Sequence, residues 1–320
     1  MIAAVIGAGV IGAGWAARFA LHGVDVRLYD AKLNEAQIQR TLEEARDSLT
    51  ALYDRPLPDQ GDVRCCDSLE DAVDGANWIQ ESVPEQLELK TRILERVESV
   101  ALRDAVIASS SSGFTPSALQ EGRLRPERVL VCHPFNPVYL LPLVEVVRSP
   151  VTNQAVVDHA ERFLYRVGMK PLVLEREIDA HVADRLLEAV WREALWLVRD
   201  GVATTEQVDN AIRYGFGLRW AQMGLFETYR LAGGEAGMRH FLAQFGPALA
   251  WPWSRLTDVP ELDEALIERI AEQSDQQSGG RSIESLRLER DRNLVAILRA
   301  LKETGSAAGA HVARWERDYS

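Results

Sequence analysis

The feature that most constrains the fold is a glycine-rich turn between a short apolar run and an alanine-rich segment of helical character. Its glycines, Gly7, Gly9 and Gly12, have the spacing G-x-G-x-x-G, and the next apolar run ends at Asp30. In a strand–turn–helix unit these glycines permit a tight turn, the approach of a pyrophosphate and close helix–strand packing. Because the start of a helix favours anions, the motif predicts a dinucleotide site.

Asp30 indicates which dinucleotide binds. A carboxylate at the end of the second strand accepts hydrogen bonds from an adenosine ribose, and its charge repels a 2′-phosphate. We therefore predict NAD as the cofactor. The predicted contacts from the turn and the first helical residues are Gly7, Gly9, Val10, Ile11 and Gly12, together with Asp30.

The first half of the chain alternates apolar runs with amphipathic segments, which predicts an α/β fold, a Rossmann-type parallel sheet with helices on both faces. The predicted strands are Ala3–Ile6, Val24–Tyr29, Trp78–Glu81, Val106–Ser109, Val129–Cys132, Leu143–Val147 and Pro171–Leu174. The predicted helices are Ile11–His22, Asn34–Leu52, Glu85–Ser99 and Val151–Val167.

From about Asp179 the pattern becomes almost purely helical, so we predict an NAD-binding domain over 1–178 and an all-α substrate and dimerisation domain over 179–320. Five of the eight tryptophans lie between Trp191 and Trp253, which predicts a helical core or a homodimer interface there. The predicted helices are Asp179–Arg199, one capped by Thr205, Glu261–Gln273 and Ile283–Leu301, with a polar loop over Ser274–Ser282.

The composition of the chain excludes several classes of binding partner. A formal net charge of −12 argues against nucleic acid and acidic membranes, and no apolar run is long enough to span a bilayer. The first predicted strand leaves no room for a leader peptide before it. Cys65, Cys66 and Cys132 fit neither a disulfide framework nor a zinc site. We therefore predict a cytoplasmic protein with reduced thiols, no metal and a small-molecule substrate.

Two segments that follow predicted strands carry candidate chemistry, because doubly wound sheets build their sites at strand ends. One is the hydroxyl-rich turn Ser109–Gly113, and the other begins at His133. An imidazole titrates near neutral pH and suits a general base. Glu145 lies in an apolar strand, where an unpaired carboxylate is costly, and an imidazole N–H would be a good partner. A catalytic pair and a purely structural hydrogen bond both remain open.

The chain resembles the 3-hydroxyacyl-CoA dehydrogenase family, in the branch that includes L-gulonate 3-dehydrogenase and lambda-crystallin. The shared motifs are Gly7–Gly12, Glu81-Ser-Val-Pro-Glu-x4-Lys90, Ser109–Gly113, His133-Pro-Phe-Asn-Pro and Leu143-Val-Glu145. The resemblance implies that His133 is the catalytic base and Glu145 its orienting partner. It also implies that Ser111 binds the reacting oxygen, with Ser112 as the alternative, and that Glu85 and Lys90 lie near the ribose and nicotinamide of the cofactor.

One position departs from the family pattern. The family has an asparagine in a Phe-Val-x-Asn-Arg sequence before the long helix, whereas this chain reads His181-Val-Ala-Asp184-Arg185. An asparagine can donate to a substrate, but an ionised aspartate only accepts. Asp184 is therefore either a structural helix residue or part of a pocket for a differently charged substrate.

The second half resembles the L-carnitine-oxidising members of the same family. The stretches concerned are Trp191–Thr205, Phe216–Phe241, Trp251–Trp253 and Gln276–Gly280. The resemblance implies oxidation of L-carnitine to 3-dehydrocarnitine by NAD. The alternatives are an L-gulonate 3-dehydrogenase, a 3-hydroxyacyl-CoA dehydrogenase and a non-catalytic NAD-binding protein.

A quaternary ammonium cannot donate an N–H hydrogen bond, so aromatic faces and diffuse negative charge must hold it. On an ideal helix Asp184, Glu188 and Trp191 share one face and are candidates for such a pocket. Further aromatic candidates are Trp220, Phe226 and Tyr229, and the candidate donors to a substrate carboxylate are Arg185, Arg192 and Arg219.

Overall fold

The computed structural model describes residues 1–221, 224–232, 240–243, 254, 261, 263–278 and 281–319. The chain divides into two compact units. Unit 1 contains Met1–Val182, Arg290–Glu303 and Gly309–Ser320, and unit 2 contains Ala183–Glu289 and Thr304–Ala308. The Trp251–Trp253 motif and parts of the Phe216–Phe241 and Gln276–Gly280 motifs lie outside the described residues.

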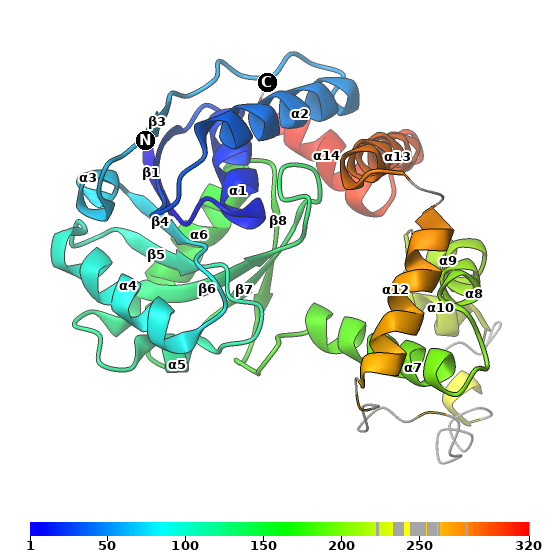
Figure 1. The fold of residues 1–320 in the computed structure, drawn as a ribbon. Coiled ribbons are helices and arrows are strands. Elements are labelled where there is room, and N and C mark those ends of the chain that lie inside the picture. The colour runs from blue at the N-terminus through cyan, green and yellow to red at the C-terminus, as the bar shows by residue number, and fades with distance from the viewer. Residues whose placement is uncertain are drawn as a thin grey trace. The chain divides into compact units, whose positions relative to one another are not determined.

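Unit 1 is built on one eight-stranded sheet with the strand order β3-β2-β1-β4-β5-β6-β7-β8 (Figure 1). The strands are β1 Ile2–Ile6, β2 Asp25–Tyr29, β3 Val63–Cys65, β4 Trp78–Glu81, β5 Val106–Ser109, β6 Val129–Pro134, β7 Leu143–Val147 and β8 Lys170–Leu174. The predicted Rossmann-type fold is confirmed, and β3 is the strand that was not predicted.

The first six strands in the sheet order are parallel, but β7 pairs antiparallel with β6, and β8 runs parallel to β7. The reason is the connection between β6 and β7, which is too short for the crossover helix that a parallel return needs. The last two strands therefore extend the sheet as predicted, in the opposite direction.

Helices cover both faces of this sheet (Figure 1). Trp78 and Ile79 of β4 point to opposite faces, as neighbouring strand residues must. The Trp78 ring packs against the tilted ring of Phe163, with centroids 4.4 Å apart, whereas Ile79 belongs to a buried cluster with Leu94 and Leu119. The helices are α1 Val10–Ala20, α2 Glu35–Leu52, α3 Leu69–Val73, α4 Leu87–Val100, α5 Pro116–Gln120, a 3₁₀ turn Pro126–Arg128 and α6 Gln154–Arg166.

Two C-terminal helices, α13 Ile283–Glu303 and α14 Ala307–Asp318, place most of their residues in unit 1. Tyr139 Oη donates to Asp291, and the ring of His311 donates from Nε2 to Gly168 O over 3.1 Å. Burial lowers the pKa of His311 to about 4, so this ring is neutral near pH 7. The predicted boundary after residue 178 assigned both helices to the second domain, whereas the compact unit around the sheet includes Arg290–Glu303 of α13 and most of α14, from Gly309 onward.

Unit 2 is helical in its described residues. Its helices are α7 Ala183–Arg199, α8 Thr205–Ala211, a π-helix Ile212–Phe216, α9 Gly217–Trp220, α10 Gly224–Ala232 and α12 Glu264–Ser278. The cap of α8 is Thr204 rather than the predicted Thr205, because Thr204 and Gln207 exchange side-chain-to-backbone hydrogen bonds as a capping box. The predicted polar loop is helical to Ser278. Across the described residues, no helix is both long and apolar enough to cross a membrane.

Candidate active site

Two glycines of the motif are required by close packing against other backbone atoms of the chain. Gly7 has φ +99°, and a Cβ there would lie 2.6 Å from Ser82 O. A Cβ on Gly12 would lie 1.8 Å from Gly7 O. A Cβ on Gly9, in contrast, would meet no atom within 4 Å. Gly9 therefore leaves open space in front of the first turn of α1, where backbone N–H groups favour a phosphate.

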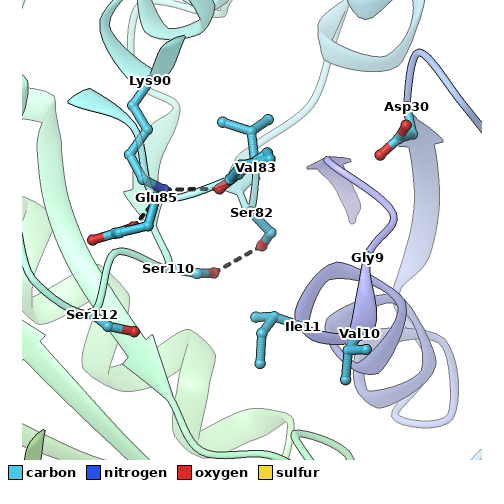
Figure 2. A pocket seen from close by; sticks show the side chains of 11 residues that line it. Gly9, Val10, Ile11, Asp30, Ser82, Val83, Glu85, Lys90, Ser110 and Ser112 are labelled. Carbon is cyan, nitrogen blue, oxygen red and sulfur yellow. Dashed lines mark hydrogen bonds and ion pairs between the residues drawn. The ribbon is translucent and has the colours of Figure 1, made fainter. Parts of the chain in front are cut away.

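A cavity of about 370 Å³ opens at the carboxyl ends of the strands. Figure 2 shows Asp30 at one end of this cavity and Ser112 at the other. The Asp30 carboxylate accepts from Ala8 N and Lys32 N, both over 2.7 Å, so its charge is fixed beside the glycine turn. The lining residues are Gly9, Val10, Ile11, Asp30, Ser82, Val83, Pro84, Glu85, Lys90, Ser110 and Ser112.

Lys90 is the buried cation of this cavity wall, with a side chain only 1% exposed. Its Nζ lies 3.0 Å from Glu81 Oε1, 3.1 Å from Val83 O and 3.3 Å from Glu85 Oε2. Glu81 is fully buried, and a buried charge is tolerated only when it is paired and hydrogen-bonded. The ammonium is therefore held in place by the two acids.

Glu85 connects this ion pair to the serine turn. Its Oε1 accepts from Ser111 Oγ over 2.5 Å and from Gly113 N over 2.9 Å. Burial alone would raise the pKa of Glu85, but the Ser111 hydroxyl, the Gly113 amide and Lys90 together hold the pKa below its ordinary value. The carboxylate is therefore ionised near pH 7 and accepts from both sides of Ser112.

His133 lies between a carboxylate and a hydroxyl. The antiparallel pairing of β6 and β7 puts His133 directly opposite Glu145, and Nδ1 lies 3.0 Å from Glu145 Oε2. On the other side of the ring, Nε2 lies 3.0 Å from Ser112 Oγ. Because an ionised carboxylate only accepts, Nδ1 carries the proton of the neutral ring, and Nε2 accepts from the Ser112 hydroxyl.

The structure separates the two predicted serines. Ser111 is fully buried, and its Oγ donates to Glu85 and accepts from Phe114 N over 2.9 Å. Ser112 lines the cavity and contacts His133. His133, Glu145 and Ser112 thus form one connected set, hereafter called the catalytic array after the role proposed for it below. The Ser111 hydroxyl, which the resemblance implies binds the reacting oxygen, is bonded to Glu85 and Phe114 instead.

The predicted face formed by Asp184, Glu188 and Trp191 in unit 2 is more exposed to solvent than the residues around His133 in unit 1. Asp184 lies in the first turn of α7, where the helix dipole favours a carboxylate. Glu188 Oε2 lies 3.7 Å from Arg192 Nε one turn later, and both side chains are partly exposed. Trp191 is 55% exposed. These features fit the structural interpretation of Asp184 as well as the substrate interpretation.

Unit 2 contains a pocket of about 250 Å³ lined by Phe216, Arg219, Trp220, Thr228 and Tyr229. It is called the aromatic pocket below. The rings of Phe216 and Trp220 lie 4.6 Å apart. Trp220, Tyr229 and Arg219 were predicted from the sequence, whereas Phe216 and Thr228, which belong to the same Phe216–Phe241 motif, were not.

Phe226 lies outside this pocket. It shares helix α10 with Thr228 and Tyr229, but its side chain is 77% exposed and does not line the cavity. The predicted set of aromatic candidates is therefore divided between a pocket wall and an outer surface.

Comparison with known protein families gives two matches along the chain. Residues 2–178 match the NAD-binding domain of 3-hydroxyacyl-CoA dehydrogenase, and residues 181–271 match the C-terminal domain of the same enzyme family. Together these matches cover most of the sequence.

Several curated relatives are about half identical to this chain. An L-carnitine dehydrogenase/betainyl-CoA thioesterase of Agrobacterium fabrum is 57% identical over 99% of this chain and 65% of its own length. A protein of the same name from Ruegeria pomeroyi is 56% identical over 96% of this chain and 63% of its own. The chain thus spans slightly less than two thirds of these relatives. An L-carnitine dehydrogenase of Pseudomonas aeruginosa is 50% identical over 96% of this chain and 95% of its own.

Solved structures agree with the fold. A 5-formyl-3-hydroxy-2-methylpyridine 4-carboxylic acid 5-dehydrogenase, described as an NAD⁺-dependent dismutase, is 28% identical, with a TM-score of 0.78. The match covers 94% of this chain and 98% of that one. The FadB2 protein of Mycobacterium tuberculosis is 25% identical, with a TM-score of 0.62 over 89% of this chain and 95% of that one.

Proposed function

The chain belongs to the 3-hydroxyacyl-CoA dehydrogenase family, and we propose that it oxidises the 3-hydroxyl of L-carnitine to 3-dehydrocarnitine with NAD. The observation that supports L-carnitine as the substrate is a sequence identity of 46–57% to relatives whose names include L-carnitine dehydrogenase. In some of these relatives the name also includes a betainyl-CoA thioesterase. The polar residues around His133 and the cavity beside the glycine turn support the reaction class.

The cofactor is NAD, and the residues of the cavity fit it. We propose that the pyrophosphate binds over Gly9, at the amides of Val10 and Ile11, because that space is open and lies at a helix N-terminus. Asp30 would accept from the adenosine ribose, and Glu85 and Lys90 would face the nicotinamide half. When bound, NAD supplies the acceptor for the hydride that leaves the substrate carbon.

The catalytic array would then move one proton. We propose that Ser112 Oγ and His133 Nε2 bind the substrate hydroxyl between them, and that Nε2 accepts its proton as the carbonyl forms. Glu145 would hold Nδ1–H, keep the ring oriented and stabilise the imidazolium. The geometry supports Ser112 in this role, since the Ser111 hydroxyl is already bonded to Glu85.

We propose that the aromatic pocket recognises the charged ends of the substrate. The faces of Trp220 and Tyr229 suit a methylated ammonium, which interacts through its diffuse charge. The guanidinium of Arg219 suits the substrate carboxylate, because its planar donors match carboxylate geometry. On α7, Asp184 and Glu188 would add negative charge, and Trp191 would add a further ring. Phe226 is exposed and is not part of this proposal.

A homodimer and a cytoplasmic location remain predictions. The homodimer is supported by α7, on which Leu186 and Leu187 are each more than half exposed. Exposed apolar side chains gathered on one helix are typical of an interaction surface. Analytical ultracentrifugation at micromolar concentration tests this, and a purely monomeric profile would remove the prediction.

The proposed reaction is tested by NADH formation with the purified protein on L-carnitine, D-carnitine, L-gulonate and 3-hydroxybutyryl-CoA. We expect turnover of L-carnitine, with much lower rates on the other three. Equal or higher efficiency on L-gulonate or on the CoA ester would move the protein to that substrate class. An absence of turnover on all four, with NAD still bound, would indicate a non-catalytic NAD-binding protein.

A further inference from the structure

The last three residues of unit 1 before α7 each contact a different part of the active site. Ala180 N donates to Gly113 O over 3.0 Å. The His181 ring donates from Nε2 to Ser111 O, also over 3.0 Å, and Val182 N donates to Glu145 Oε1 over 3.0 Å. This segment therefore holds both carbonyls that flank Ser112 and the carboxylate that orients His133.

The backbone of this segment has an unusual conformation. Ala180 has φ 57° and His181 has φ 49°, in the left-handed region that residues other than glycine rarely adopt. Such residues persist only where their surroundings determine the conformation strongly, and they gather at functional sites. Here the conformation directs three consecutive hydrogen-bond donors at the serine turn and at Glu145.

His181 is fully buried, and its ring packs against the catalytic imidazole. The centroids of His181 and His133 lie 5.5 Å apart, and Phe135 lies 5.0 Å from His133. His133 therefore has ring contacts with His181 and with Phe135.

The two nitrogens of His181 have different surroundings. A carbonyl oxygen only accepts, so Nε2 must carry the proton that bonds to Ser111 O. Nδ1 is buried and has no hydrogen-bond partner in the described part of the chain. An unpaired buried nitrogen is unfavourable, and a phenylalanine would fill similar space without it. The hydrogen bond from Nε2 to Ser111 O therefore explains why a histidine, rather than a phenylalanine, occupies this position.

We infer that His181 is a positioning residue for the catalytic array, acting through the Ser111–Gly113 turn. Glu85 holds this turn at Ser111 Oγ and Gly113 N, and the Ala180–Val182 segment holds it at Ser111 O and Gly113 O. Ser112 lies between these two sets of bonds, which hold its backbone beside His133, where its hydroxyl meets Nε2 over 3.0 Å. The role of the array in carnitine oxidation rests on the proposed function.

Three variants separate positioning from stability. His181→Phe removes the donor but keeps a ring, and His181→Gln replaces it with an amide N–H of similar reach. His311→Phe is the matched control, because that ring is also buried and donates from Nε2 to a carbonyl, at Gly168. A displacement of about 1 Å at a reacting group can cost about a hundredfold in rate.

We expect His181→Phe to lower kcat at least about tenfold, with the KM values for NAD and carnitine changed less than about twofold. His181→Gln should recover most of kcat. His311→Phe should lower the melting temperature and leave kcat unchanged. The inference is overturned if kcat of His181→Phe stays at the wild-type value, or if His181→Gln is as impaired as His181→Phe.

A measurement on the unmodified protein keeps the inference testable if the variants fail to fold or if carnitine is not a substrate. In protein labelled with ¹⁵N-histidine, NMR reports which nitrogen of each of the six rings carries the proton. We expect His181 as the Nε2–H tautomer, with that proton exchanging slowly with solvent. A His181 ring protonated at Nδ1 alone would contradict the inference without affecting the proposed reaction.

Discussion

The catalytic array of unit 1 and the aromatic pocket of unit 2 are built in different ways. Ser112, His133 and Glu145 are joined by hydrogen bonds of 3.0 Å, and Glu145 is fully buried. Trp220 and Tyr229 are 40% and 41% exposed, and the aromatic pocket combines ring faces with one guanidinium. The difference suits the two tasks that we propose for them, because proton transfer requires a fixed direction and a methylated cation requires only nearby ring faces.

This contrast leads to different expectations for substitutions. A side chain removed from the array should affect kcat, since it acts on the reacting hydroxyl. A ring removed from the aromatic pocket should affect the KM of the substrate, since the cation–ring attraction is present before and during the reaction.

The largest effect is expected from His133→Ala. Removal of a general base typically costs about 10²–10⁴-fold in turnover, and the binding of NAD should stay nearly unchanged, because His133 does not line the cofactor cavity. Steady-state kinetics and fluorescence titration with NAD measure the two quantities. Near-normal turnover of the variant would remove His133 from the mechanism.

The two neighbouring serines offer a sharper comparison within the array. Ser112→Ala should lower kcat about tenfold to a hundredfold, because one of the two groups that hold the substrate hydroxyl is lost. Ser111→Ala should cost about 1–3 kcal/mol of unfolding free energy, since Glu85 and the Phe114 amide lose a buried partner. Thermal unfolding and kcat are measured on both variants. The assignment of Ser112 fails if Ser111→Ala has the larger effect on kcat.

At the far end of the cofactor cavity, Asp30→Ala should narrow the preference for NAD over NADP. The substitution removes the charge that repels a 2′-phosphate, and it also removes the partner of Ala8 N. We expect the ratio of kcat/KM for NAD to that for NADP to fall about tenfold, the cost of about 1.4 kcal/mol. Equal use of both cofactors by the wild-type protein would contradict the role of Asp30.

The sequence predicted Gly9, Val10, Ile11 and Asp30 as neighbours, and all four line one cavity, because the signals for them are local. The glycine spacing, the apolar runs and Asp30 lie within one strand–helix–strand unit, so their positions follow from chain order alone. The pairing of His133 with Glu145 was predicted for a similar reason, since a polar residue in an apolar strand needs a partner.

Other features depend on tertiary structure that no local pattern records. Ser111 and Ser112 are adjacent in an irregular turn, so only the three-dimensional course of the chain shows which hydroxyl faces His133. The strand β3 has three residues, too few for a periodic signal. Helices α13 and α14 continue the helical pattern of the second half of the chain, and nothing in that pattern indicates packing on unit 1.

The central claim is that the array performs the chemistry and the aromatic pocket selects a cationic substrate. It is tested most directly by kcat/KM for L-carnitine and for 3-hydroxybutyrate, which keeps the hydroxyl and carboxylate but lacks the ammonium. The two substrates are compared in the wild-type protein, in Trp220→Ala and in Phe226→Ala, the last being a matched aromatic change outside the aromatic pocket.

We expect the wild-type protein to prefer L-carnitine strongly. Trp220→Ala should reduce that preference about two- to thirtyfold, the equivalent of about 0.5–2 kcal/mol of cation–ring attraction, and Phe226→Ala should leave it unchanged. If the wild-type protein oxidises 3-hydroxybutyrate as efficiently as L-carnitine, recognition of the cation by the aromatic pocket is contradicted.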